Sequence, residues 1–278
     1  MIRMLATQLP GETASFDAQI LLAHITGHNR AWLLSHPEEK LTIQQELLLQ
    51  RAVQQLQDGV PLPYVLGHWE FFGLDFVVNP RVLIPRPETE LLIETALAQV
   101  RSHPLIDYRI LDIGTGSGII PISLAVHVPQ ADLVATDISP TALKVAERNA
   151  EKHGVSDRIQ FIEANLVPSD LDLNRFDIIC ANLPYIPSET LINLHIFGKE
   201  PTLALDGGPD GLDLIRNLLE ILAAAHLEDC LILLEIEQRQ GAVVSNMARE
   251  AFPRAEYIRI QRDLAGFDRL AVINLSNN

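Results

Sequence analysis

A glycine-rich segment, Asp112-Ile113-Gly114-Thr115-Gly116-Ser117-Gly118, lies between an apolar run and a helix-like run. Glycine lets a ligand approach the backbone closely, and the first turn of a helix offers unpaired N–H groups. We therefore predict that residues 114–118 bind a ligand, with a purely structural tight turn as the other interpretation. The dinucleotide fingerprint G-x-G-x-x-G would need a glycine where this chain has Pro121, which disfavours a nicotinamide dinucleotide.

The acidic residue Asp137 stands at the end of the next predicted strand, just before Ile138-Ser139-Pro140, which reads as the start of a helix. A carboxylate at such a strand end can accept hydrogen bonds from two ribose hydroxyls. A plain helix cap is the alternative, although Ser139 can fill that role. The glycine turn and Asp137 together indicate a ligand that contains adenosine and needs no pyrophosphate.

A third polar group, Asn182-Leu183-Pro184-Tyr185, follows the apolar run 177–181. In open parallel sheets, ligands bind in the crevice at the carboxyl ends of the strands. We therefore expect Asn182 to face the ligand of the glycine turn. Its side-chain oxygen and the Leu183 carbonyl are hydrogen-bond acceptors, and Tyr185 offers a flat wall for a planar group.

These three groups, in this order and spacing, resemble the class I S-adenosylmethionine-dependent methyltransferases. The third resembles the [Asn/Asp]-Pro-Pro-[Tyr/Phe] motif of enzymes that methylate planar amino or amide nitrogens. Further segments are similar to those of the release-factor glutamine methyltransferases: Gly67-His68-Trp69-Glu70-Phe71, Leu83-Ile84-Pro85-Arg86-Pro87-Glu88-Thr89-Glu90, Glu200-Pro201, Ala204-Leu205, Gly207-Gly208, Asp210-Gly211-Leu212, Leu233-Leu234-Glu235-Ile236 and Arg262-Asp263-Leu264-Ala265-Gly266.

The resemblance implies S-adenosyl-L-methionine as cofactor and class I peptide-chain release factors as protein substrate, methylated on a glutamine of a Gly-Gly-Gln loop. It assigns the cofactor to Gly114–Gly118, Asp137, Asn182 and the pair Asn165 and Leu166. It assigns catalysis and glutamine binding to Asn182, Leu183, Pro184 and Tyr185, with Arg86 and Glu88 also binding the substrate. For Asn165 and Leu166, ordinary loop residues are an equal interpretation, because the family commonly has an acidic and an aromatic residue there.

Two positions depart from the family pattern. Leu183 stands where the family usually has proline, and Glu237 stands where it usually has glycine. Because Leu183 precedes Pro184, it is already biased towards extended dihedrals, and we expect the site to survive the change. For the turn that contains Glu237, the sequence predicts no particular conformation.

The elements that must position these residues follow from the hydrophobic pattern. Predicted strands span 109–113, 133–137, 159–162, 177–181, 231–236, 257–260 and 270–275, and predicted helices span 90–100, 118–128, 139–153, 212–225 and 240–251. Apolar strands that alternate with amphipathic helices predict an α/β fold, namely a Rossmann-like, mostly parallel seven-stranded sheet covered on both faces.

The chain before this region has a different pattern. Apolar residues recur at helical spacing through residues 16–57, which predicts an N-terminal helical bundle over residues 1–60. Prolines at positions 61 and 63 end that pattern, and residues 64–78 suggest a short hairpin within a linker, 61–80. The methyltransferase domain is expected at 81–278. By resemblance, the bundle binds the release factor.

Composition narrows the function further. A net charge of −15 and a pI near 4.9 disfavour nucleic acid and anionic membranes as partners. The charge argues against one alternative function, the dimethylation of adenine in ribosomal RNA, although the enzymes of that class also use Asn-Leu-Pro-Tyr. A non-catalytic protein that only binds translation factors is the third hypothesis. His24 and His28 lack a third ligand at metal-binding spacing, so no metal is expected. Without a signal peptide or membrane span, and with only Cys180 and Cys230, we predict a cytoplasmic monomer.

Overall fold

The computed structural model describes residues 1–102 and 107–275. The chain divides into two compact units, Met1–Trp69 and Glu70–Asn278, and the division falls inside the segment 61–80 that the sequence predicts as a linker. Each unit has a hydrophobic core of its own. No helix within the described ranges is long and apolar enough to cross a membrane.

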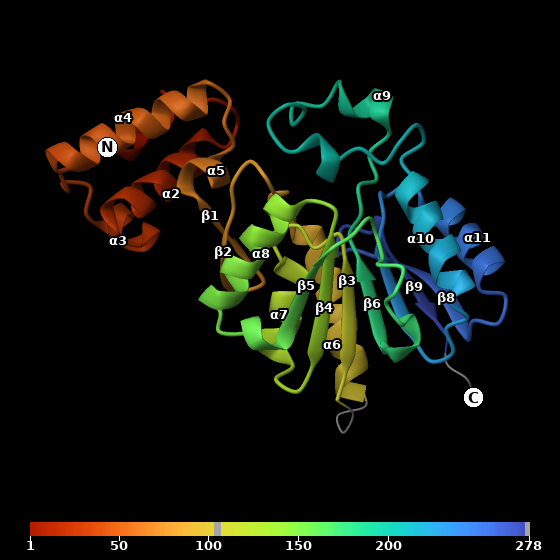
Figure 1. Cartoon of the computed structure of the whole chain (residues 1–278). Helices are drawn as coiled ribbons and strands as arrows, with labels where there is room; N and C mark the ends of the chain where they lie inside the picture. The colour runs from red at the N-terminus through yellow and green to blue at the C-terminus, as the bar shows by residue number, and fades with distance from the viewer. Residues whose placement is uncertain (103–106, 276–278) are drawn as a thin grey trace. The chain divides into compact units, whose positions relative to one another are not determined.

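The first unit is built from helices, as its sequence pattern predicts. They are α1 (Ile2–Ala6), α2 (Ala14–Thr26), α3 (Arg30–Ser35), α4 (Ile43–Gln57) and α5 (Leu62–Leu66) (Figure 1). A capping box starts α4: the Thr42 hydroxyl accepts from the Gln45 N–H, and the Gln45 side chain accepts from the Thr42 N–H. Such a cap contributes about 1 kcal/mol.

The structure corrects the start of the predicted hairpin. Pro61 and Pro63 end one helix but also begin another, because α5 has Pro61 as its N-cap and Pro63 in its first turn. A helix leaves its first N–H groups unpaired, so proline is tolerated there. The two-stranded sheet therefore starts at His68 rather than at Tyr64, with β1 (His68–Phe71) and β2 (Leu74–Val77).

The second unit contains the predicted seven-stranded sheet, in the order β5-β4-β3-β6-β7-β9-β8. Neighbouring strands from β5 to β7 are parallel, whereas β9 pairs antiparallel with both β7 and β8. The strands are β3 (Arg109–Ile113), β4 (Asp132–Asp137), β5 (Ile159–Glu163), β6 (Ile178–Ala181), β7 (Leu231–Glu235), β8 (Tyr257–Arg262) and β9 (Asp268–Asn274). The mostly parallel, Rossmann-like prediction is confirmed.

Helices cover both faces of this sheet. They are α6 (Glu90–Ser102), α7 (Ile119–His127), α8 (Pro140–Lys152), α10 (Asp213–Ala224) and α11 (Gly241–Ala251). The short helix α9 (Ser188–Leu191) lies beyond the carboxyl ends of the strands (Figure 1), and 3-10 turns occur at Pro87–Thr89, Ser156–Arg158, Leu173–Arg175 and Thr202–Ala204. Alternate residues of β3 enter different cores: Ile110 packs with α6 and α7, whereas Leu111 packs with α10 and α11. This two-sided burial explains the near-continuous apolar strands.

The chain direction across the sheet reverses beside β3. From β3 the chain moves outward through β4 to β5, and it then returns to β6 on the other side of β3 (Figure 1). Ligands of open parallel sheets bind at such a switch point, beyond the carboxyl ends of the strands. The glycine turn, Asp137 and Asn182 all follow strands that end at this edge.

Candidate active site

The glycine turn after β3 packs directly against the Asn-Leu-Pro-Tyr loop. At Gly114, φ is +75°, a conformation that strains any residue with a Cβ atom, and such an atom would lie 2.9 Å from Leu183 Cδ2 and displace that side chain. Gly114 and Gly116 line a cavity of 380 Å³ at this edge of the sheet. Thr115 and Ser117 are buried beneath the turn, and neither they nor Gly118 lines that cavity. The backbone, rather than these side chains, therefore faces the ligand space.

Asp137 ties the glycine turn to the start of the next helix. Its Oδ2 accepts from the Gly116 N–H and its Oδ1 from the Ser139 N–H, both at 2.8 Å. Ser139 is the residue that caps α8, accepting from the Ala142 N–H at 3.2 Å. Burial raises the pKa of Asp137, and the two N–H donors oppose that rise. Each oxygen keeps a lone pair for one hydroxyl of a ribose.

Asn165 and Leu166 line the same cavity. Leu166 has a φ of +62°, a left-handed conformation that costs about 1–2 kcal/mol for a residue with a Cβ atom. Its carbonyl oxygen accepts from the buried Thr136 hydroxyl at 2.7 Å, which holds it in that conformation. Asn182, Leu183 and Pro184 complete the part of the lining that the sequence predicts.

Other cavity walls were not predicted from the sequence. They come from residues 80–83, before the Pro-Arg-Pro segment, and from Pro201, Leu203 and Ala204. Arg86 joins these two segments through an ion pair with Glu200, which is only 5 % exposed. The second Glu200 oxygen accepts from the Ile84 N–H at 3.1 Å. The Glu200-Pro201 motif therefore has a structural reason: it holds the Pro-Arg-Pro segment at the cavity.

A second cavity, of 210 Å³, adjoins the first. The two share Leu83, Ala204 and the three residues Asn182, Leu183 and Pro184 as walls. Arg86 and Glu88 line this second cavity, together with Tyr185 and Arg269. Arg269 was not predicted, although it follows the Arg-Asp-Leu-Ala-Gly motif, whose Asp263 binds it at 2.9 Å.

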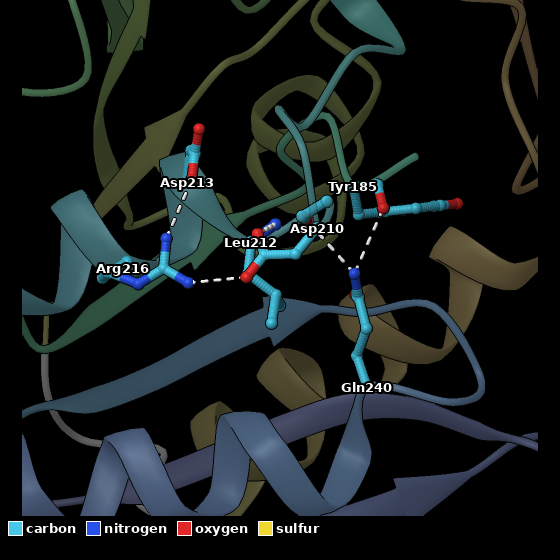
Figure 2. Close-up of polar contacts among 7 residues, drawn as sticks. Tyr185, Asp210, Leu212, Asp213, Arg216 and Gln240 are labelled. Carbon is cyan, nitrogen blue, oxygen red and sulfur yellow. Dashed lines mark hydrogen bonds and ion pairs between the residues drawn. The ribbon is translucent and has the colours of Figure 1, made fainter. Parts of the chain in front are cut away.

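The loop that contains Asn182–Tyr185 is supported from behind by Gln240 (Figure 2). The buried Gln240 amide donates to the Tyr185 and Gly211 carbonyl oxygens, each at 3.1 Å, and its oxygen accepts from the Glu237 N–H at 3.0 Å. Gln240 thus joins three segments that are far apart in the chain. The sequence shows no motif at Gln240, so only the folded structure reveals this role.

The structure also accounts for the two departures. Leu183 is 4 % exposed, and its side chain packs against Gly114. An apolar leucine therefore fills this position, although it lacks the rigid backbone of a proline. Glu237 is absent from the described residues that have positive φ, so a Cβ atom causes no strain at that turn. Its carboxylate pairs with Arg239 at 3.1 Å, on the side towards solvent.

Asp112, at the start of the glycine-rich segment, bears on whether the site suits a positively charged nucleoside. Its side chain is fully buried, and neither carboxyl oxygen has a hydrogen-bond partner among the described residues. Burial raises the pKa of Asp112 to about 7. A positive charge nearby would stabilise its ionised form. Gly114, Gly116 and Asp137 line the cavity and fit the nucleoside of S-adenosylmethionine, whereas the unpartnered Asp112 carboxyl lies outside the lining, two residues before Gly114.

Comparison with solved structures confirms the fold. The catalytic domain of hMettl16, in complex with the MAT2A 3′UTR hairpin 6, superimposes with a TM-score of 0.57 at 16 % identity, covering 84 % of this chain and 81 % of that chain. The N-terminal domain of human METTL16 in complex with SAH gives a TM-score of 0.52 at 15 % identity, covering 86 % and 85 %. At this level of identity the likeness concerns the fold alone.

Sequence comparison is more specific. Residues 3–67 match the family model of the PrmC N-terminal domain, and residues 110–195 match that of a methyltransferase domain. The release factor glutamine methyltransferase of Moorella thermoacetica is 41 % identical over 259 residues, covering 93 % of this chain and 90 % of that protein. Those of Bordetella pertussis and Bacillus anthracis are 36 % and 35 % identical, and each alignment covers at least 91 % of this chain.

The sheet order, the glycine turn after β3, Asp137 after β4 and the Asn-Leu-Pro-Tyr loop after β6 define a class I methyltransferase. The N-terminal unit and the near-complete alignments narrow this further. The chain belongs to the release factor glutamine methyltransferase family.

Proposed function

We propose that this chain transfers a methyl group from S-adenosyl-L-methionine to the side-chain amide nitrogen, N5, of the glutamine in the Gly-Gly-Gln loop of class I peptide-chain release factors, and so modulates translation termination. The observation that supports this most directly is the shared wall of the two cavities, Asn182–Pro184. A cofactor in the larger cavity and a glutamine side chain in the smaller one would meet at this wall.

The amide nitrogen of glutamine is a poor nucleophile, because resonance draws its lone pair into the carbonyl. The site must therefore hold both N–H groups and direct the remaining electron density. Asn182 Nδ2 donates to the Thr89 hydroxyl at 3.0 Å, which leaves Asn182 Oδ1 as an acceptor for the substrate. The Leu183 carbonyl is the second acceptor, and the Tyr185 ring is a flat wall. Positioning of this kind can contribute about 7–11 kcal/mol.

On the cofactor side, the backbone of the Gly114–Gly118 turn, which reaches the cavity at Gly114 and Gly116, binds the nucleoside together with the Asp137 carboxylate, the Asn165-Leu166 pair and Asn182. When bound, S-adenosylmethionine supplies a methyl group on a positively charged sulfur. No strong base is required before the transfer, because the methylated nitrogen becomes cationic and then readily loses a proton.

The remaining assignments concern the protein substrate. Arg86 and Glu88 contact the loop that carries the glutamine, since both line the smaller cavity. The helical bundle, residues 1–60, binds the release factor; α4 leaves the apolar side chains of Ile43, Leu47 and Leu48 exposed. The chain acts as a monomer in the cytoplasm, where release factors are found. Nucleic acid is not its substrate.

A labelling experiment tests the proposal. With methyl-labelled S-adenosylmethionine and a class I release factor, the wild-type chain should label the factor, and replacing the loop glutamine by alanine should abolish the label. Asn182→Ala should lower kcat by about 10²–10³-fold, because it removes one positioned acceptor. Asn246→Ala, an exposed asparagine on α11, is the matched control.

Two results would contradict the proposal. Label that persists after the loop glutamine is replaced would place the reaction on another residue. Label that enters RNA rather than the release factor would support adenine methylation, the rival activity that the Asn-Leu-Pro-Tyr motif leaves open.

A further inference from the structure

A buried glutamate, Glu235, lies behind the Asn-Leu-Pro-Tyr loop and outside both cavities. It ends β7, and its side chain is 2 % exposed. It does not line either cavity, so it contacts neither cofactor nor substrate there. A buried carboxyl group is unfavourable unless its surroundings use it. The question is what Glu235 does for the loop in front of it.

One end of the loop reaches Glu235 through Tyr185. The Tyr185 hydroxyl donates to Glu235 Oε1 at 3.4 Å. Burial, reinforced by the negative charge of Glu235, raises the pKa of the Tyr185 phenol, so the hydroxyl stays a donor. Because this bond joins the far end of the side chain to β7, it fixes the direction of the Tyr185 side chain, which lines the smaller cavity.

The other end of the loop reaches Glu235 through Thr89. The Asn182 amide donates to Thr89 Oγ1, which is fully buried, and the Thr89 hydroxyl proton must then point to a different acceptor. Glu235 Oε2 is buried and has no hydrogen-bond partner among the described residues, and the nearby Thr89 hydroxyl lowers the pKa of Glu235. We therefore take this carboxyl group as the acceptor that the Thr89 hydroxyl requires. Hydrogen bonds are then donated in one direction, from the Asn182 amide to the Thr89 hydroxyl and from the Thr89 hydroxyl to Glu235.

That direction matters because an asparagine amide has two ends of similar shape and opposite polarity. If Thr89 donated to Asn182 instead, the amide would turn its N–H groups to the substrate and repel the glutamine amide. An ionised Glu235 can only accept a hydrogen bond, so it draws the Thr89 O–H towards itself and excludes this arrangement. We infer that Glu235 is a positioning residue, which acts through Thr89 and Tyr185 to present Asn182 Oδ1 and the Tyr185 ring to the glutamine.

The inference rests on the proposed function, and it adds a pH dependence. Burial raises the pKa of Glu235 to about 7, with Thr89, Tyr185 and Arg269 lowering it and Glu88 raising it. Arg86 also faces this cluster through Tyr185. Because the ionised form orders the network, kcat should rise as pH increases through about 7.

The kinetic test compares isosteric variants. Glu235→Gln and Thr89→Val should each lower kcat about tenfold to a hundredfold, the effect of losing a hydrogen bond to a charged group. The affinity for S-adenosylmethionine should not change, since neither residue lines its cavity. Thr89→Ser keeps the hydroxyl and should retain activity. Glu237→Gln, two residues along and paired only with exposed Arg239, is the matched control.

Two kinetic outcomes would overturn the inference. One is an equal loss of kcat in Thr89→Ser and Thr89→Val, which would show that shape rather than the hydroxyl matters. The other is a Glu235→Gln enzyme that keeps the wild-type rise of kcat through pH 7.

A readout without turnover separates this inference from the proposed function. In the wild type, the side-chain NH₂ group of Asn182 should exchange slowly by NMR, and Asn182→Ser identifies its signal. Faster exchange in Thr89→Val and in Glu235→Gln supports the network even if no release factor is methylated. Unchanged exchange in both variants rejects it even if the release factor is the substrate.

Discussion

Asp112 and Glu235 are carboxyl groups that the fold buries near the carboxyl ends of β3 and β7, two parallel strands that lie on either side of β6. In both, burial is the main cause that raises the pKa to about 7. Natural chains rarely retain such groups without a compensating role, because isolated buried charges are unfavourable. Here one lies beneath the cofactor turn and the other behind the substrate loop. Under the proposed function, one carboxyl group would support the cofactor side and the other the substrate side.

The raised pKa of Asp112 predicts how stability depends on pH. A carboxyl group whose pKa is higher in the folded state stabilises the fold below its unfolded pKa, and this contribution is lost as pH rises through the folded value. Without cofactor, the free energy of unfolding should fall between pH 5 and pH 8, by about 3 kcal/mol for this group. Asp112→Asn should flatten the curve, as measured by urea denaturation.

The pKa of Glu235 is also raised by folding, so its contribution to stability is lost over the same pH range. The Asp112→Asn variant should therefore keep part of the fall in the free energy of unfolding. A wild-type curve that is level from pH 5 to pH 8 would show that neither carboxyl changes its protonation over that range.

At the scale of elements, the segment 207–212 is the platform for the Asn-Leu-Pro-Tyr loop. Asp213 and Asp210 pair with Arg216 at 2.8 Å, and Asp210 also accepts from the Leu212 N–H, which shapes this segment where α10 begins (Figure 2). A Cβ atom at Gly207 would lie 2.7 Å from the Pro184 carbonyl oxygen. The glycines of the Gly207-Gly208 and Asp210-Gly211 motifs thus allow two loop backbones to touch.

Gly211→Ala should disrupt that contact. Gly211 has a φ of +77°, and a Cβ atom there would overlap the Tyr185 carbonyl oxygen. We expect kcat to fall at least about tenfold, because small displacements of reacting groups are costly. Affinity for S-adenosylmethionine should change little. Gly154→Ala is the matched control, since its φ is +67° with nothing within 4 Å, and it should cost only about 1 kcal/mol of stability.

Steady-state kinetics and calorimetric binding of S-adenosylmethionine measure both effects. If Gly154→Ala lowered kcat as much as Gly211→Ala, the cause would be lost stability and not the contact between the two loops.

For the whole molecule, two units with separate cores share a net charge of −15. The second unit contains both cavities, so the first is not needed to form them. On α4, Ile43 is 80 % exposed and Leu47 is 52 % exposed, which is unusual for large apolar side chains. Such groups are typical of protein interfaces. This supports a division of labour in which the first unit recognises the release factor.

Replacing Ile43 and Leu47 together by serine should test that division. We expect KM for the release factor to rise about tenfold, as for the loss of an interface contact. The values of kcat and of the affinity for S-adenosylmethionine should stay as in the wild type. Val243→Ser, an exposed apolar residue on α11, serves as the control. An unchanged KM would move the recognition surface elsewhere.

Much of this protein is determined by its local sequence. Hydrophobic periodicity placed the seven strands of the large sheet and helices α6, α7, α8, α10 and α11 within two residues of their observed ends, because each pattern reflects the faces that one element buries. The short helix α9 was not predicted. The glycine turn, Asp137 and Asn182 were found in the same way, since residues at the ends of parallel strands meet at one edge. The hairpin start was wrong because proline can both end a helix and begin one.

The tertiary structure alone decided how these groups are supported. Thr89 and Glu235 lie 93 and about 50 residues from the loop residues that they contact, and Gln240 lies 55 residues from Tyr185. Local patterns carry no information about such pairs, because a contact across a sheet depends on strand order and register. Sequence therefore indicated which residues form the candidate site, and the packing of distant segments determined how they are oriented.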